Sequence, residues 1–324
     1  MLSPEITKFI LHQTRASAIT TLETIQSLWS GYGSIVKVGL EGAPLSSVVV
    51  KNISLPDTKR HPRGWNTNRS HARKLHSYEV EMNWYQNWND ACTSLCRIPR
   101  HLGSRSSSLG DIIILEDIDA AGFPERKSRL TKQQTLPCLK WLANFHATFL
   151  NQSPSGLWQI GTYWHLDTRP DELAAMEDGP LKEAAKAIDT KLNECEYKTL
   201  VHGDAKVANF CFSENGENVA AVDFQYIGGG CGIKDVIYFL GSCLDETECE
   251  RWAHELLDHY FFCLRNALTQ KISSIEIDKL EEEWRSLYSV AWTDFYRFLK
   301  GWMPDHFKIN SYSDSLAEST LNSL

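Results

Sequence analysis

The stretch HGDAKVAN at residues 202–209, followed after a short apolar run and a turn by VDFQ at residues 222–225, gives the clearest indication of the fold. Asp204, Asn209 and Asp223 stand on predicted turns at the ends of buried strands, where side chains converge on a cleft. Carboxylate and amide oxygens suit Mg²⁺, and phosphoryl transfer needs a metal ion on the phosphates and a carboxylate that orients the acceptor hydroxyl. The pattern therefore predicts a magnesium-dependent phosphoryl-transfer site. The alternative is a polar turn in which Asp204 caps a helix.

The same segment resembles a known family of enzymes. The H-G-D-x-x-x-x-N pattern, with an aspartate 19 residues after the first, is similar to the catalytic and metal-binding segments of the aminoglycoside phosphotransferase and choline-kinase-like family. Within that group, HGDAKVANFCF, VDFQ and GGGCGIKDVIYFL most resemble the ecdysteroid-kinase-like small-molecule kinases. The resemblance implies an α+β, bilobal, protein-kinase-like fold with a small β-rich N-lobe and a larger, mainly helical C-lobe. Gln225 departs from the glycine of the protein-kinase D-F-G triplet, at a position where these small-molecule kinases vary.

The resemblance also implies a role for each residue of the motif. Asp204 would be the catalytic base, Asn209 and Asp223 would bind Mg²⁺, and His202 would brace the loop. Asp235 matches an aspartate that ties the catalytic lobe together, so we expect it to have a structural role.

The N-terminal part contains the side chains that a protein-kinase-like nucleotide site requires. Lys51 closes the apolar run Val48–Val50 and would hold the α- and β-phosphates of ATP, while Glu81, or as an alternative Glu79, would pair with it. By local sequence alone, Lys51 fits the solvent end of a strand and both glutamates fit ordinary helix acids. The order of lysine, glutamate, hinge, HGD and D-F is kept along the chain, and this order favours the functional assignment.

Two backbone segments complete the predicted nucleotide site. The turn at residues 31–34 resembles the phosphate-covering loop, in which Gly31, Gly33 and Ser34 would lie against the nucleotide. The segment LEDI at residues 115–118 resembles the hinge, in which backbone groups of Glu116 and Ile118 would hydrogen-bond adenine. The turn lacks the third glycine of G-x-G-x-x-G, and the run at residues 228–234 does not satisfy the Walker pattern, so neither a Rossmann site nor a Walker loop is predicted.

The periodicity of apolar residues changes along the chain and predicts two lobes. The predicted elements are a helical region at 1–30, a β-hairpin at 31–54, a buried strand at 111–118, an amphipathic helix at 136–150, two short strands around the turn Asn215-Gly216, and helices beyond Lys234. We therefore predict an N-terminal nucleotide-binding lobe at residues 1–117 and a C-terminal catalytic and substrate-binding lobe at residues 118–324.

The composition excludes several classes of function. The formal net charge of −8 argues against a surface that attracts nucleic acid or an anionic membrane. The longest uncharged apolar runs are far shorter than the roughly 18 residues that cross a bilayer, and the N-terminus has no basic region followed by an apolar one. The nine cysteines include no C-x-x-C pair, which is typical of reduced thiols and predicts a cytoplasmic protein.

One basic segment stands out in this acidic chain. Residues 59–76 carry six Lys or Arg side chains and no acid, and we predict a basic loop that leads into a helix through Tyr78 to about Trp88. A solvated loop is the default interpretation, since a single patch does not predict a nucleic-acid partner. The alternative is that Arg63, Arg73 or Lys74 neutralises the triphosphate or an anionic substrate.

Aromatic residues recur at helical spacing near the C-terminus, between residues 284 and 302, with Asp294 and Arg297 among them. Core packing explains most such stripes. In the family that the sequence resembles, however, C-terminal helices form the wall of the acceptor pocket, so Asp294 and Trp302 are candidate substrate contacts.

These observations predict an ATP- and Mg²⁺-dependent enzyme that moves the γ-phosphoryl group to a hydroxyl of a small molecule. A catalytically silent, nucleotide-binding pseudokinase-like scaffold is the first alternative, although a lost ligand would be its usual sign. A protein kinase is the second alternative. No A-P-E triplet follows Asp223, and only a short glycine-rich turn separates Phe224 from Asp235, so the segment that docks a peptide is not predicted. The sequence identifies neither the acceptor nor the oligomeric state.

Overall fold

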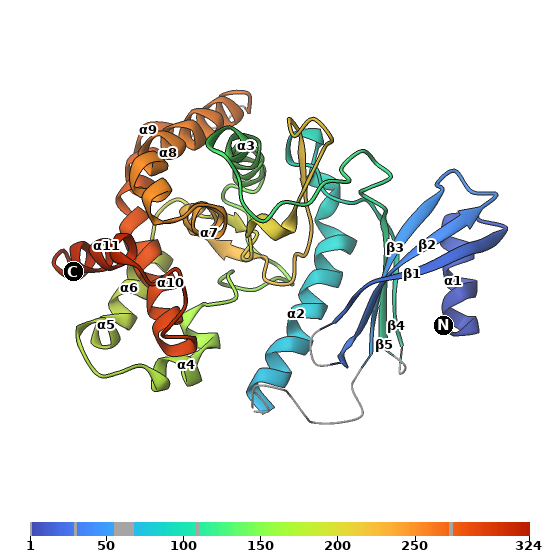
Figure 1. The fold of residues 1–324 in the computed structure, drawn as a ribbon, viewed down its shortest axis with the longest axis horizontal. Coiled ribbons are helices and arrows are strands. Elements are labelled where there is room, and N and C mark those ends of the chain that lie inside the picture. The colour runs from blue at the N-terminus through green and yellow to red at the C-terminus, as the bar shows by residue number, and fades with distance from the viewer. Residues whose placement is uncertain (1, 29–30, 55–67, 108–109, 272–274) are drawn as a thin grey trace.

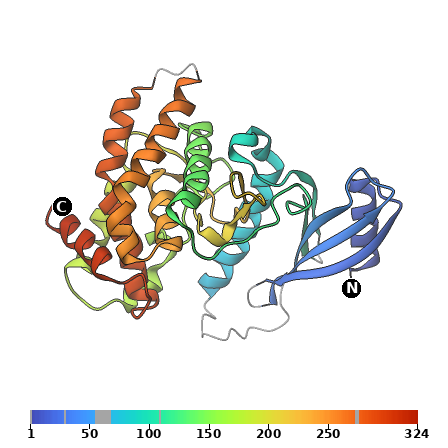
Figure 2. The same ribbon diagram turned by 45° about the horizontal axis from the view of Figure 1, so that its top comes forward.

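The computed structural model describes every residue except 1, 29–30, 55–67, 108–109 and 272–274. A β-sheet lobe and a larger helical lobe lie on opposite sides of helix α2 (Asn68–Asn87), and the two chain ends lie at opposite ends of the molecule (Figure 1). A second view of the ribbon shows the same separation (Figure 2). The predicted α+β, bilobal, protein-kinase-like fold is therefore confirmed, whereas the exact division at residues 117/118 stays a prediction.

The N-terminal lobe is built on one antiparallel sheet with the strand order β1-β2-β3-β5-β4. Its strands are β1 (Ala18–Ser27), β2 (Gly33–Glu41), β3 (Ser47–Ile53), β4 (His101–Ser107) and β5 (Gly110–Glu116). The predicted hairpin and the predicted buried strand correspond to β2–β3 and to β5. Strand β3 occupies the centre of the sheet, so a neighbouring strand flanks it on each side.

The two faces of this sheet contact different partners because side chains alternate along each strand. Val48 and Val50 point to the outer face, where helix α1 (Pro4–Thr14) covers them through Ile10. Ile53 and Ile113 point to the inner face and join the large core that includes α2 and the helical lobe. The inner face of β3 is therefore the side that faces the second lobe.

The prediction of a helical region across residues 1–30 is wrong in its second half, because β1 occupies Ala18–Ser27. Strand β1 lies at the edge of the sheet and exposes nearly all its side chains, including Leu22 and Ile25. An edge strand is held by backbone pairing on one side and needs no alternating buried face, so the periodic burial of an inner strand is absent although residues 18–27 are rich in Ile and Thr.

The basic segment is only in part a loop. Helix α2 begins at Asn68, so Arg69, Arg73 and Lys74 lie on the helix itself. Lys59, Arg60 and Arg63 lie outside the described residues.

The C-terminal lobe is mainly helical, as predicted. Its helices are α3 (Lys132–Thr148), α4 (Pro170–Ala175), α5 (Pro180–Glu183), α6 (Ala185–Asn193), α7 (Ile233–Cys243), α8 (Glu246–Thr269), α9 (Ile277–Ser286), α10 (Tyr288–Trp302) and α11 (Ser311–Leu321). Helix α10 is buried at every residue from Val290 to Leu299, so it forms the centre of this lobe. Among the described residues, no helix combines the length and the apolar character needed to cross a membrane.

Two pairs of very short strands lie where the helical lobe faces the sheet. They are β6 (Thr199–Val201) with β9 (Gly228–Gly230), and β7 (Phe210–Phe212) with β8 (Val219–Ala221). Gly228 packs directly on main chain, because a Cβ atom there would lie 2.2 Å from the Trp158 carbonyl oxygen. The segment at 158–161 and strand β9 thus contact each other backbone to backbone, without intervening side chains.

Candidate active site

Lys51 lies on the inner face of the central strand and reaches helix α2. Its Nζ atom lies 2.5 Å from Glu81 Oε2 and 3.7 Å from Asp223 Oδ1, and the Lys51 and Glu81 side chains are almost fully buried. Burial alone would lower the pKa of Lys51, but the carboxylates of Glu81 and Asp223 outweigh this effect and raise it. Lys51 is therefore held as an ammonium ion that links the sheet, α2 and the segment after β8.

The structure brings only one of the two candidate glutamates to Lys51. Glu79 is exposed and contacts His76, with 3.1 Å between His76 Nδ1 and Glu79 Oε2. Glu81 is 2% exposed.

The loop at residues 202–209, called the HGD loop below, begins directly after β6. His202 joins it to the segment before Asp223, because His202 Nε2 donates a hydrogen bond to the Val222 carbonyl at 3.1 Å. The other ring nitrogen, Nδ1, accepts from the backbone N–H of Asp204 at 3.3 Å. Both contacts are satisfied by one neutral tautomer with the proton on Nε2, which fits the bracing role that we predicted.

Asp235, in the first turn of α7, fixes the start of the HGD loop through hydrogen bonds to its backbone. Its carboxylate accepts from the backbone N–H groups of His202 at 2.6 Å and Gly203 at 3.0 Å, and lies 3.1 Å from His146 Nε2. Gly203 has φ 78°, and a Cβ atom there would lie 2.0 Å from the Tyr226 carbonyl oxygen. Only glycine therefore fits at this position, and this requirement fixes the backbone conformation of the loop.

Replacing Asp235 with asparagine should destabilise the protein without altering any side chain that faces the cleft. The amide can accept from only one of the two backbone donors, and leaving a buried donor unsatisfied costs about 2–3 kcal/mol of unfolding free energy. Urea unfolding followed by circular dichroism measures this loss. Asp178→Asn, which alters an exposed aspartate, is the matched control and should leave the unfolding free energy unchanged. Equal stability of the two variants would contradict the structural role of Asp235.

Asp204 lies at the tip of the HGD loop and is surrounded by donors. Asn209 Nδ2 donates to the Asp204 backbone carbonyl at 2.8 Å and to its Oδ2 at 3.1 Å. Lys206 Nζ lies 2.8 Å from the same Oδ2. Burial raises the pKa of Tyr238 well above its usual value, and the nearby Asp204 carboxylate adds to this shift. Asn209 and Lys206 thus fix Oδ2 of this carboxylate, and the Tyr238 hydroxyl also contacts the Asp204 side chain.

Asp223 is held in an unusual backbone conformation and in a polar chain. Its φ of 71° is rare for a non-glycine residue, and such strain is concentrated at functional sites. Gln225 Nε2 donates to Asp223 Oδ1 at 2.7 Å, while Gln225 Oε1 accepts from Lys74 Nζ at 2.6 Å. The glutamine in place of glycine therefore connects Asp223 to α2.

The sequence interpretation missed Lys206, and it named Lys74 and Gln225 without predicting that they contact each other. Two signals were available. Lys206 lies two residues after Asp204. Lys74 lies seven residues before Glu81, which places both of these α2 side chains on one helix face.

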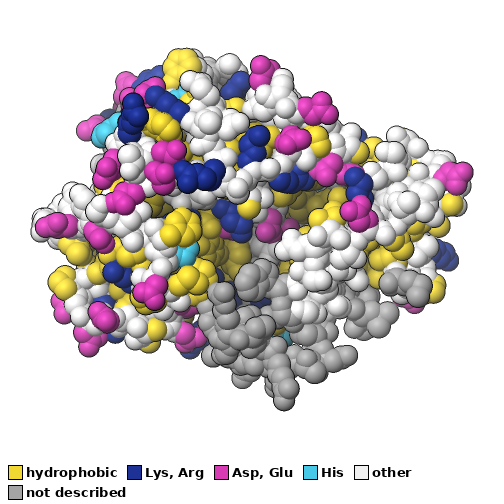
Figure 3. Space-filling model, viewed as in Figure 1, with side chains coloured by type: hydrophobic (Ala, Val, Ile, Leu, Met, Phe, Trp, Pro, Cys, Tyr) yellow, Lys and Arg dark blue, Asp and Glu magenta, His cyan; other side chains and the backbone are white. Residues whose placement is uncertain are grey.

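Among the described residues the surface is hollowed between the two lobes, and basic and acidic side chains meet there (Figure 3).

The predicted metal ligands form an incomplete set of oxygen donors. No group of three or more His, Cys, Asp or Glu side chains suited to a metal ion occurs in the described part of the chain. Because Asn209 donates through Nδ2, its Oδ1 can act as a ligand beside Asp223. Mg²⁺ is often bound by one or two protein oxygens together with substrate phosphates and water, so Asn209 and Asp223 fit such an ion only when a nucleotide is present.

The predicted nucleotide backbone contacts lie at the start of strand β2 and at the end of strand β5. Gly31 precedes β2, and Gly33 and Ser34 begin it, where Leu28 N–H donates to the Gly33 carbonyl at 2.8 Å. The N–H of Glu116 donates to the Arg100 carbonyl, and the carbonyl of Ile118 accepts from Phe123. The hinge contact that we predicted would therefore have to use the Glu116 carbonyl and the Ile118 N–H.

Of the two predicted substrate contacts, the structure places Asp294 in the core, whereas the contact of Trp302 with a substrate stays a prediction. Asp294 is 2% exposed and belongs to the core. Its Oδ1 pairs with Arg297 at 2.8 Å and its Oδ2 accepts from Trp164 Nε1 at 3.1 Å. Trp302 stacks on Phe298 with 5.6 Å between the ring centroids, so its ring extends the aromatic packing of α10. Core packing, the commoner explanation for the aromatic stripe, is the better description of Asp294.

Comparison with known proteins agrees with this geometry. The model of the ecdysteroid kinase-like family matches residues 161–272, which include the HGD loop, Asp223 and Asp235. No curated protein matches the sequence.

Solved structures with the same fold cover nearly the whole chain. The microcompartment-associated aminopropanol kinase is 16% identical, with a TM-score of 0.55 over 99% of this chain and 98% of that one. The amicoumacin kinase hAmiN, solved in complex with AMP-PNP, Ca²⁺ and Ami, is 13% identical, with a TM-score of 0.56 over 98% of this chain and 92% of that one. At these identities the likeness shows the fold. The resemblance predicted from the HGD motif is thus confirmed: the chain has the protein-kinase-like fold of the small-molecule kinases, and its segment 161–272 matches the ecdysteroid kinase-like family.

Proposed function

We propose that this protein is an ATP-dependent kinase that transfers the γ-phosphoryl group to a hydroxyl of a small molecule. The observation that carries the proposal is the buried Lys51 ammonium, which contacts Glu81 and Asp223 at the point where the sheet, α2 and the helical lobe meet. In kinases, a buried lysine that is held by carboxylates and lies near the catalytic aspartate positions the phosphates of a nucleoside triphosphate. Here the HGD loop supplies that aspartate. The matched family and the two solved kinases support the same class of reaction.

In this proposal the N-terminal lobe, residues 1–117, binds the nucleotide. The Glu116 carbonyl and the Ile118 N–H bind adenine, Gly31, Gly33 and Ser34 cover the phosphates, and Lys51 neutralises the α- and β-phosphates. Asn209 and Asp223 hold Mg²⁺, which when bound neutralises the phosphate oxygens and fixes their position.

The C-terminal lobe, residues 118–324, supplies the chemistry in this proposal. Asp204 orients the acceptor hydroxyl and takes its proton while the acceptor oxygen bonds to the γ-phosphorus and the bond from that phosphorus to the bridging oxygen of ADP breaks. Lys206, 2.8 Å from Asp204 Oδ2, lies where it can neutralise charge on the transferred group.

Specific observations favour this function over its alternatives. Lys51, Asp204, Asn209 and Asp223 are all present, whereas a pseudokinase-like scaffold would typically lack one of them. Strand β9 begins at Gly228 and α7 at Ile233, so the described chain between Asp223 and α7 has no room for a peptide-docking activation segment.

The experiment that tests the proposal is a measurement of Mg²⁺-dependent ADP release from ATP. The acceptors are amino alcohols, aminoglycosides, sugars, sterols and hydroxy acids, with generic protein substrates as a separate arm. Mass spectrometry of the acceptor should show the added phosphoryl group. Stabilisation by ATP without ADP release on any acceptor would favour the scaffold instead.

Replacing Glu81 with glutamine should lower kcat/KM for ATP by about 10- to 100-fold, because Lys51 loses a charge-assisted hydrogen bond that fixes its position. Glu79→Gln is the matched control, since this exposed residue lies on the same helix two positions away, and it should have no effect. Steady-state kinetics at varied ATP concentration measures both variants. A larger effect of Glu79→Gln would contradict the pairing.

A further inference from the structure

A cavity of about 430 Å³ opens at the C-terminal end of α7, next to the HGD loop. It lies between the end of α7, the first turn of α8, helix α10 and the segment that leads into α11, and its walls include Ser242, Asp245, Trp292, Phe307, Lys308 and Tyr312. Ser242 ties the cavity to the catalytic loop, because its hydroxyl oxygen accepts a hydrogen bond from the Val207 backbone N–H at 2.8 Å. The cavity wall thus contacts the backbone of the HGD loop three residues after Asp204.

Most charged side chains on the cavity wall already have protein partners. Arg129 lies 2.8 Å from Asp245 and 3.1 Å from Glu248, so its one positive charge is shared between two carboxylates. Glu246 accepts a hydrogen bond from the Ser311 hydroxyl. Apart from Lys308, the charged groups that the structure describes at the cavity are therefore net negative, and only Lys308 could bind an anion there.

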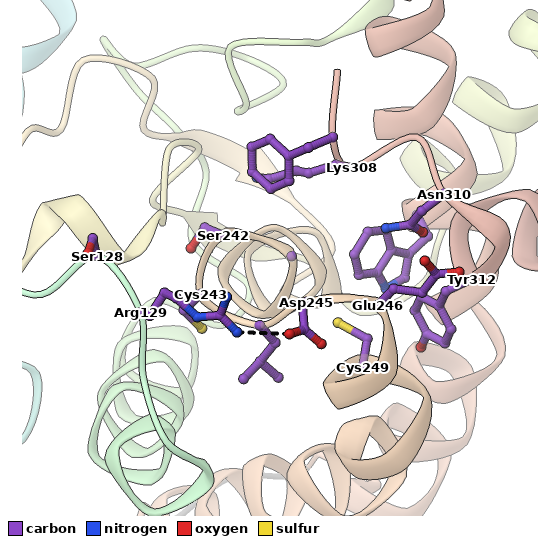
Figure 4. Close-up of a pocket in the computed structure, with 14 residues that line it drawn as sticks. Ser128, Arg129, Ser242, Cys243, Asp245, Glu246, Cys249, Lys308, Asn310 and Tyr312 are labelled. Carbon is purple, nitrogen blue, oxygen red and sulfur yellow. Dashed lines mark hydrogen bonds and ion pairs between the residues drawn. The ribbon is translucent and has the colours of Figure 1, made fainter. Parts of the chain in front are cut away.

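Lys308 is the exception. Within the described residues its ammonium group has neither a carboxylate partner nor a hydrogen-bond acceptor. It lies near three aromatic rings, 4.8 Å from the centroid of Tyr238, 5.2 Å from that of Phe295 and 6.0 Å from that of Phe307. Figure 4 shows Lys308 on the same side of the cavity as Ser242 and apart from the ion pair of Arg129 with Asp245. The unpaired charge thus lies on the side of the cavity that adjoins the HGD loop.

The simplest explanation for such a lysine is packing on aromatic rings. Lys300, 5.2 Å from the Tyr296 ring centroid, is an example that lies outside this cavity. Lys308 differs because it lines the cavity and because burial lowers its pKa to about 8, although the nearby Asp204 carboxylate raises it. An ammonium ion removed from water and left without a counter-ion is destabilised, and an anion in the cavity would reverse this loss.

We infer that the acceptor of the proposed kinase reaction carries an anionic group, either a carboxylate or a sulfate or phosphate ester, and that Lys308 binds this group while the acceptor hydroxyl faces Asp204. The rings of Trp292 and Tyr312 would contact the apolar body of the acceptor. This inference rests on the proposed function and narrows it to one class of substrate.

Binding of small matched probes tests the inference before the natural acceptor is known. The anionic probes are para-hydroxymethylbenzoate and para-hydroxymethylphenyl sulfate and phosphate. The neutral and cationic probes are para-hydroxymethylbenzamide and para-hydroxymethylbenzylamine. Each is titrated calorimetrically at millimolar concentration into the full chain with AMP-PNP and Mg²⁺, so that no turnover occurs.

We expect at least one anionic probe to bind more tightly than the neutral and cationic ones. Lys308→Met should weaken its binding by about 10- to 100-fold, the cost of one charge-assisted hydrogen bond, and Lys308→Arg should retain most of it. Lys300→Met is the matched control and should change nothing. The carboxylate, sulfate and phosphate arms distinguish the kinds of anion.

The inference is overturned if no anionic probe binds, if the neutral or cationic probe binds as tightly, or if Lys308→Met and Lys300→Met behave alike. Turnover with ATP is measured separately. Lys308-dependent binding of an anion without ADP release would contradict the kinase proposal alone. ADP release with a neutral or cationic acceptor, equal in wild type and Lys308→Met, would contradict this inference alone.

Discussion

Asp204→Asn is expected to lower kcat by about 10²–10⁴-fold, the contribution typical of a positioned general base. Asparagine has nearly the same shape as aspartate and still offers an oxygen to Lys206, which lies 2.8 Å from Asp204 Oδ2. It cannot take the proton of the acceptor hydroxyl. The affinity for ATP should therefore stay unchanged while the rate of phosphoryl transfer falls.

Single-turnover measurements, with enzyme in excess over ATP, separate the chemical step from binding and release. The exposed Asp178→Asn is again the control, because it changes the same atoms far from any buried contact. A normal single-turnover rate in Asp204→Asn would refute the assignment of Asp204 as the base.

Asp223→Asn should reduce turnover by roughly 10³-fold or more, because it removes the carboxylate that we assign to the metal and half of the charge that balances Lys51. Asp223 Oδ1 lies 3.7 Å from Lys51 Nζ, so the substitution also alters the electrostatics of the phosphate site. Unlike Asp204→Asn, this variant should lose the Mg²⁺ dependence of nucleotide binding.

Calorimetric titration of ATP at a series of Mg²⁺ concentrations distinguishes the two aspartates. With EDTA present, Asp223→Asn should bind ATP at least as tightly as wild type, because one carboxylate beside the phosphates is gone, whereas added Mg²⁺ should strengthen binding to wild type only. If Mg²⁺ strengthened ATP binding to both proteins alike, Asp223 would not be a ligand.

The sequence was most informative where the site is local. The HGD loop, β8 and Asp235 lie within 35 residues, and their spacing reflects one strand-turn-strand unit, so the motif predicts its own geometry. The choice between Glu79 and Glu81 could not be made, because it depends on which face of α2 meets β3, a contact between segments 30 residues apart.

Long-range contacts explain the remaining differences. Asp294 was a plausible cleft residue until its partner Trp164, 130 positions earlier in the chain, was located. Lys308 carries no local signal at all, since its significance comes from the ring of Tyr238 and from a cavity built by four separate segments. Strand β1 was missed because an edge strand is defined by its neighbour and not by its own side chains.

The backbone-to-backbone contact beneath the HGD loop has a consequence for how this chain tolerates variation. At Gly203 and Gly228 a new side chain would meet carbonyl oxygens, which cannot rotate away as a neighbouring side chain can. In a library of all single substitutions, these positions should reduce the abundance of soluble protein in cells for every replacement, however small. Substitutions of Asp204 should instead yield variants of near-normal abundance that are inactive. Measuring abundance and activity for the same variants would therefore separate the residues that the fold requires from those that take part in the reaction.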